Sequence, residues 1–105
     1  METPNLSYIH SMARGDDSFV MKIIGVMKGE FTNEVDEYKN NIKLNNFKVA
    51  SENVHKIKHK ISILGLEKSY ALANDYENEL KEGKLDLHND FDKILQIIDD
   101  YLLTI

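Results

Sequence analysis

A histidine followed by a lysine three residues later and a glycine ten residues later forms the segment of this chain best suited to chemistry. The segment runs His55-Lys56-Ile57-Lys58-His59-Lys60-Ile61-Ser62-Ile63-Leu64-Gly65. Imidazole titrates close to physiological pH, so much of it is neutral in the cell and has a ring nitrogen free to attack phosphorus. An ammonium group one helical turn away would stabilise the negative charge of a transferred phosphoryl group. The spacing therefore indicates phosphoryl acceptance by His55, with Lys58 as the neighbouring cation.

The apolar residues around His55 recur at helical spacing and decide which side chains face water. They form one stripe at Phe47, Ala50, Val54, Ile57, Ile61 and Leu64. The polar residues of the same segment share the opposite face, which holds Lys48, Ser51, Glu52, His55, Lys58, His59 and Ser62. We therefore expect His55 to be exposed, with Lys58 beside it on the water-facing surface.

Four further residues on or near this face are candidate binding positions. Ser51 and Ser62 carry hydroxyls that can contact a phosphate or a partner, although an ordinary solvent-facing serine fits Ser62 equally well. Gly65 can terminate the helix, because glycine adopts the left-handed conformation at low cost. Side chains on a helix lean toward its N-terminus, so His59 should lie partly over the patch beside His55.

Helical spacing extends along nearly the whole chain. The pattern predicts helices at about 5–13, 16–43, 46–64, 67–82 and 88–103. No segment shows sustained period-two alternation, so the expected fold class is all-α. Short connections favour an antiparallel up-and-down four-helix bundle, with the short N-terminal helix across one end. Asp16 or Asp17 is expected to cap the second helix, and the expected inward residues of the fourth are Tyr70, Ala73, Tyr76 or Glu77, and Leu80.

Length and composition restrict the class of protein. The 105 residues correspond to one domain, and the absence of cysteine excludes disulfides and thiolate metal sites. The net charge of −5 argues against a general nucleic-acid binder, although four lysines and two histidines gather between residues 48 and 60. The N-terminus lacks the pattern of a signal peptide, and no apolar run approaches the ~20 residues of a membrane span. We expect a cytoplasmic protein that binds neither nucleic acid nor membrane.

The segment around His55 resembles the histidine-phosphotransfer (HPt) domains of multistep two-component phosphorelays. Their motif has histidine, then a hydrophobic residue, lysine, a small residue and glycine at fixed later positions. The corresponding residues here are His55, Ile57, Lys58, His59 and Gly65. Two further matches extend the resemblance over nearly the whole chain: Gly15-Asp16-Asp17 at the start of the long helix, and Tyr76-Glu77.

The resemblance implies a phosphocarrier rather than an enzyme with its own ATP site. His55 would accept a phosphoryl group from the aspartyl phosphate of a receiver domain, in a hybrid histidine kinase or a response regulator, and pass it to another receiver. Lys58 would stabilise the transferred group. The receiver would supply the aspartate and the bound Mg²⁺, so no cofactor is expected on this chain. Residues 1–105 would form a single HPt domain that acts as a monomer.

His59 occupies a position where the family usually has a small residue, commonly glycine, which leaves room for a receiver. Three interpretations stay open: His59 narrows the choice of receiver, it adds a hydrogen-bond donor to the bound phosphoryl group, or it is a tolerated neutral replacement. Because of His59, the alternative function is a docking module of the same fold that binds receivers or kinases without carrying phosphate.

His55 and His59 also have the four-residue spacing of a metal-chelating pair. The zinc-protease motif requires glutamate directly after the first histidine, and this chain has Lys56 there. Two imidazoles beside three lysines make a poor cation site. No metal site is therefore predicted.

Overall fold

The computed structural model describes residues 2–105, which form five α-helices and no strand. The helices are α1 (Ser7–Ala13), α2 (Asp17–Lys43), α3 (Phe47–Ile63), α4 (Glu67–Lys81) and α5 (His88–Leu102). The predicted all-α class is confirmed for these residues, and each helix lies within two residues of its expected bounds. None of the helices in this part of the chain combines the length and apolar character needed to cross a membrane.

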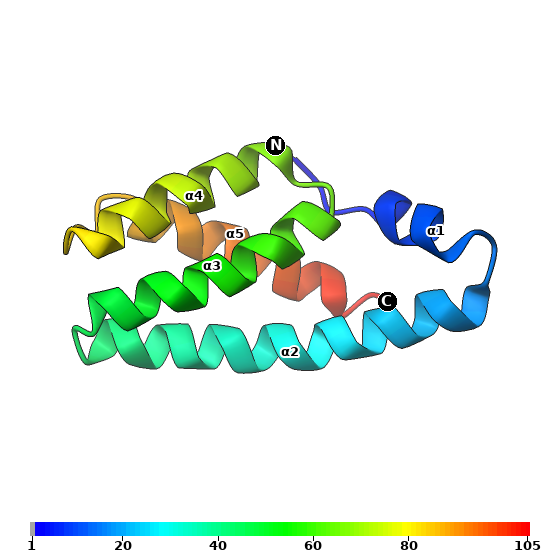
Figure 1. The fold of residues 1–105 in the computed structure, drawn as a ribbon, viewed down its shortest axis with the longest axis horizontal. Helices are drawn as coiled ribbons and strands as arrows, with labels where there is room; N and C mark the ends of the chain where they lie inside the picture. The colour runs from blue at the N-terminus through cyan, green and yellow to red at the C-terminus, as the bar shows by residue number, and fades with distance from the viewer. Residues whose placement is uncertain (1) are drawn as a thin grey trace.

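Successive long helices run in alternating directions along the long axis of the molecule (Figure 1). α3 makes its most extensive contacts with α2 on one flank and with α4 on the other. α1 packs against α2 and lies beyond the end of α3 (Figure 1). α3 therefore has two covered flanks and one face between them that meets solvent.

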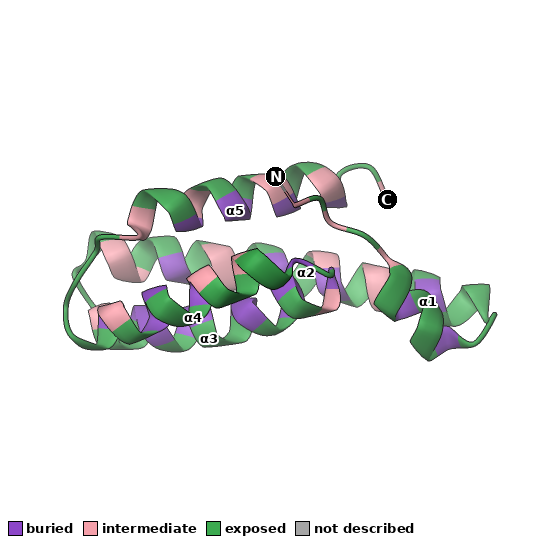
Figure 2. Cartoon of the chain, turned by 90° about the horizontal axis from the view of Figure 1, so that it is seen from above, coloured by how far each residue is buried: buried purple, intermediate pink, exposed green. Residues whose placement is uncertain are grey.

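The apolar stripes of the helices meet in one core, and the buried positions line the facing sides of the helices (Figure 2). The largest fully buried side chains include Phe31, Tyr38, Ile57, Ile61, Leu64, Tyr76, Phe91 and Ile98. The inward stripe predicted for α3 is confirmed from Ala50 to Leu64, whereas Phe47 is half-buried. One inward prediction is wrong, because Tyr70 on α4 is 37% exposed. Its ring lies over the amine of Lys58 on the α3–α4 flank instead of entering the core.

The turn after α3 determines how α4 returns alongside it. The Leu66 amide donates to the Ile61 carbonyl at 3.2 Å and the Gly65 amide donates to the Ser62 carbonyl at 3.0 Å, which are the two bonds of a Schellman cap. Gly65 has a φ of +77°, and a Cβ there would come within 2.5 Å of the Asn5 side chain. The prediction that Gly65 ends this helix is confirmed.

Carboxylates close the N-termini of two helices. Asp16 Oδ1 accepts a hydrogen bond from the Phe19 amide at 3.1 Å, so Asp16 is the cap of α2. The first turn of α4 is capped from a distant part of the chain. Glu2 accepts from the amides of Lys68 and Ser69 at 2.7 and 2.8 Å, which ties the N-terminal segment to the start of α4.

Candidate functional site

His55 projects from the solvent-facing side of α3. Its side chain is 52% exposed, so the predicted exposure of this imidazole is confirmed. Its Nδ1 lies 3.2 Å from both carboxylate oxygens of Glu77 on α4. An ionised carboxylate only accepts hydrogen bonds, so Nδ1 carries the proton in this contact. The neutral ring then has its lone pair on Nε2.

Glu77 is a buried carboxylate that three nitrogen groups surround. The residue is 7% exposed. Besides His55, it contacts Lys58 Nζ at 3.1 Å and Lys81 Nζ at 3.4 Å. Burial alone would raise the pKa of Glu77, but the hydrogen bonds from Lys58 and His55 outweigh burial and hold this pKa below its ordinary value. Glu77 is therefore an anion at neutral pH.

Lys58 does not lie on the water-facing surface, which corrects the sequence-based prediction. The residue is 6% exposed. Its ammonium group donates to Asn74 Oδ1 at 3.0 Å and pairs with Glu77, and the Tyr70 ring centroid is 5.4 Å away. The reason is that Lys58 lies on the flank of α3 against which α4 packs. Lys58 therefore reaches His55 only through the carboxylate that both residues contact.

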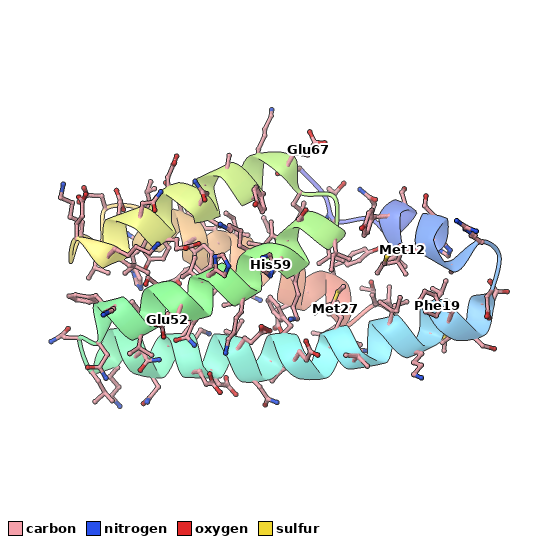
Figure 3. The ribbon with its side chains drawn as sticks, viewed as in Figure 1. Met12, Phe19, Met27, Glu52, His59 and Glu67 are labelled. Atoms are coloured by element: carbon pink, nitrogen blue, oxygen red, sulfur yellow. The ribbon has the colours of Figure 1, made fainter. Side chains whose placement is uncertain are left out.

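His59 lies against His55 on the exposed side of α3. The two ring centroids are 4.9 Å apart and the rings meet edge to face at 71°. The prediction that His59 lies beside the His55 patch is confirmed, and Figure 3 shows His59 on the C-terminal half of α3. Among residues 2–105, no three histidine, cysteine, aspartate or glutamate side chains gather as a metal-binding group.

The remaining predicted binding residues separate into two environments. Ser51 is 2% exposed rather than water-facing, because it too lies on the flank next to α4. Its hydroxyl donates to the Lys48 carbonyl at 2.6 Å. Ser62 is exposed and, with Gly65, lines a surface cavity of about 500 Å³ near the α3–α4 turn. Ser62 and Gly65 thus share a cavity that His55 does not line.

A larger surface cavity of about 670 Å³ includes His55 in its lining. Lys56 and Lys81 bring positive charge to this cavity, and Glu37 and Glu52 bring negative charge. The mixture of signs means that the cavity is not a preformed anion site. The group in it with distinctive chemistry is the His55 imidazole.

An apolar groove of about 320 Å³ lies on the α2 flank of α3. Its lining includes Phe19, Ile23, Val26 and Met27 of α2 and Ile63 of α3. Ile63 follows His59 by one helical turn, so the groove adjoins the histidine pair along the same side of α3. Figure 3 shows Phe19 and Met27 along α2, with Met12 of α1 facing Phe19.

Glu77 belongs to the site but was not among the site residues predicted from the sequence. The periodicity allowed Tyr76 or Glu77 to face inward, and both are buried. Tyr76 satisfies its hydroxyl with that of Tyr38, at 2.6 Å. The sequence pattern could have indicated the role of Glu77, because a carboxylate at an inward helical position requires a hydrogen-bonding or cationic partner. His55 and Lys58 on the neighbouring helix supply those partners.

Comparison with known proteins assigns no family. No family model matches the chain, and no curated protein or solved structure matches it.

Proposed function

We propose that this protein is a phosphorelay intermediate, which accepts a phosphoryl group from a receiver-domain aspartate onto His55 and passes it to another receiver domain. The observation that supports this function most directly is the 3.2 Å contact between Nδ1 of the exposed His55 and the buried carboxylate of Glu77. The proposed protein is a monomeric, cytoplasmic HPt domain. Its helices form an antiparallel up-and-down four-helix bundle with a short additional N-terminal helix.

The transfer step requires only the imidazole and the phosphorylated aspartate of the receiver. The Nε2 lone pair of His55 forms a bond to phosphorus while the bond from phosphorus to the aspartate oxygen breaks, and that electron pair returns to the aspartate carboxylate. The imidazole becomes cationic, with its proton still on Nδ1. Glu77 accepts the hydrogen bond from that proton and stabilises the positive charge that develops on the ring. The reverse reaction with a second aspartate passes the group on.

Lys58 has a positioning role in this mechanism. Its ammonium group is buried and bonded to Glu77 and Asn74, so it acts on His55 through Glu77. Its hydrogen bond and charge help to keep the Glu77 carboxylate ionised beside Nδ1. The resemblance to HPt domains assigned Lys58 directly to the phosphoryl group, and the buried contacts favour the indirect role.

The receiver would dock over the exposed face of α3. Exposed Phe19 and Val26 lie in the apolar groove that adjoins the histidine pair. A cluster of exposed apolar side chains of this kind is typical of a protein contact surface. The receiver would bring the aspartate and Mg²⁺, which is consistent with a carrier that has no nucleotide site of its own.

The second candidate function is a docking module that binds receivers or kinases without carrying phosphate. The observation that favours it is the His59 ring, which lies 4.9 Å from the His55 ring at a position where HPt domains usually have a small residue. The two functions make opposite predictions about covalent labelling of the chain.

A transfer assay distinguishes them. The protein is incubated with a panel of receivers carrying labelled aspartyl phosphate, and the products are treated with acid and with alkali. The proposal predicts label on this chain that is lost in acid, retained in alkali and abolished by His55→Gln. The matched control is His88→Gln, which removes a histidine on α5 and should leave labelling unchanged. Binding without any label would support the docking module, and label that persists in His55→Gln would refute the assignment of His55.

A further inference from the structure

We infer that His59 is a second catalytic imidazole, which donates a hydrogen bond to the phosphoryl group carried by His55. This inference rests on the proposed phosphorelay function. It assigns to His59 the contact that the motif assigned to Lys58. The sequence left three interpretations of His59 open: a narrower choice of receiver, donation to the phosphoryl group, and a neutral replacement. The geometry points to donation.

The placement of the two rings supports the contact. Their centroids are 4.9 Å apart and their planes meet at 71°, so the edge of one ring is directed at the other. Glu77 holds the Nδ1 edge of His55 from the α4 side. Nε2 is therefore the ring nitrogen available to carry a phosphoryl group, and His59 lies beside the same ring on the exposed side of α3.

Two lysines, Lys58 and Lys81, are paired with the Glu77 carboxylate. Lys58 is buried and bonded to Glu77 and Asn74. Lys81 pairs with Glu77 Oε2 at 3.4 Å. Both ammonium groups thus lie at the carboxylate that contacts Nδ1. The His59 ring lies against the His55 ring itself and can donate from a ring N–H.

The donor chemistry of His59 suits a phosphoryl oxygen. A neutral imidazole has one N–H and a protonated imidazole has two, so a donor is present in either form. A hydrogen bond to an anionic oxygen is stronger than one between neutral groups. Loss of such a bond should slow phosphoryl transfer to His55, and shorten the lifetime of the phosphohistidine, by about tenfold.

Three variants separate hydrogen bonding from bulk. His59→Leu keeps volume but has no donor, His59→Ala has neither, and His59→Gln retains an N–H of similar reach. The phosphoryl group is loaded in two ways, from a labelled receiver and from the small donor phosphoramidate, where the imidazole nitrogen displaces ammonia from phosphorus. Loading rate and lifetime of the label are measured in wild type and in the three variants. His10→Gln on α1 is the matched control for loss of a remote histidine.

We expect loading rate and label lifetime to fall about tenfold in His59→Leu and His59→Ala and to fall less in His59→Gln, while His10→Gln stays close to wild type. His59→Ala that loads from the receiver as fast as wild type, or faster, would overturn it and identify His59 as an obstruction or a neutral residue. Equal lifetimes in all variants would overturn it as well. Thermal unfolding by circular dichroism establishes that each variant is folded.

NMR of the imidazole rings in the wild-type protein gives a second test. If His59 had a purely structural role, phosphorylation of His55 would not change the chemical shifts of the His59 ring. Phosphorylation of His55 should shift the ring nitrogen and proton signals of His59 and leave those of His10 and His88 in place. Unmoved His59 signals would contradict the contact. A wild-type protein that takes label from no receiver and not from phosphoramidate would refute the proposed function itself, whereas normal labelling with identical variants would refute only the role of His59.

Discussion

The ammonium group of Lys58 and the carboxylate of Glu77 lie 3.1 Å apart on the flank where α4 packs against α3, and both residues are buried. The same carboxylate contacts Nδ1 of the exposed His55. A buried ion pair therefore supports an exposed imidazole. This relationship couples the stability of the α3–α4 contact to the chemistry proposed for His55, and the first three predictions test that coupling.

Replacing Glu77 should reduce both stability and function. Glu77→Ala leaves Lys58 buried without its anion, and we expect a loss of about 3 kcal/mol in the free energy of unfolding. It also removes the acceptor that holds the proton on Nδ1, so phosphoryl transfer to His55 should slow. Urea unfolding and the transfer assay measure the two effects. The control is Asp75→Ala at an exposed position of the same helix, and a Glu77→Ala protein as stable as this control would contradict the buried pair.

Lys58→Met tests the indirect role of the lysine. Methionine keeps the length of the buried stem but removes the charge, so we expect a loss of about 2–3 kcal/mol in the free energy of unfolding. Because Lys58 acts through Glu77, the double variant Lys58→Met/Glu77→Gln should transfer phosphoryl no more slowly than Glu77→Gln alone. Additive losses of transfer rate would indicate instead that Lys58 contacts the phosphoryl group. Lys48→Met on the exposed surface of α3 serves as the control.

The lowered pKa of Glu77 predicts the direction of a pH effect on stability. The pKa is below its ordinary value of 4.5 in the folded protein, so the unfolded chain binds more protons between the two values. The contribution of Glu77 is therefore complete above 4.5 and is lost as pH falls through the folded pKa. Urea unfolding of wild type and Glu77→Gln across this range should show the difference between them shrinking toward low pH. A difference that grows as pH falls would refute the assignment.

The hydroxyls of Tyr38 and Tyr76 predict strong coupling between two core positions. They lie 2.6 Å apart and both residues are fully buried. Tyr38→Phe or Tyr76→Phe alone leaves one buried hydroxyl without a partner, at a cost of about 1–2 kcal/mol each. The double phenylalanine variant should cost less than the sum of the single changes. A double-mutant cycle measures this coupling energy, and strictly additive losses would contradict the hydrogen bond.

Local features of the fold were predictable from the sequence because they depend on neighbouring residues. Helical periodicity predicted the apolar stripe of α3, and its members from Ala50 to Leu64 are buried. The cap at Asp16 and the helix end at Gly65 involve backbone groups only a few residues away. The exposure of His55 followed from the same stripe, because His55 points away from it.

Positions on the flanks of the stripe were predicted less well. Lys58 and Ser51 were placed on the water-facing surface and are buried, whereas Tyr70 was placed in the core and is exposed. All three lie on facing flanks of α3 and α4. The period of one helix orders its residues around its own axis but does not say how far the surface of a neighbouring helix extends around it.

The sequence by itself determined which helices form, which faces carry apolar side chains, and that an imidazole stands exposed with a second histidine one turn away. The tertiary structure alone decided the partner of that imidazole. His55 and Glu77 are 22 residues apart on different helices, and their contact depends on how far α4 is shifted along α3 after the turn. Helical periodicity contains no information about that longitudinal register, because packing between two side-chain surfaces sets it.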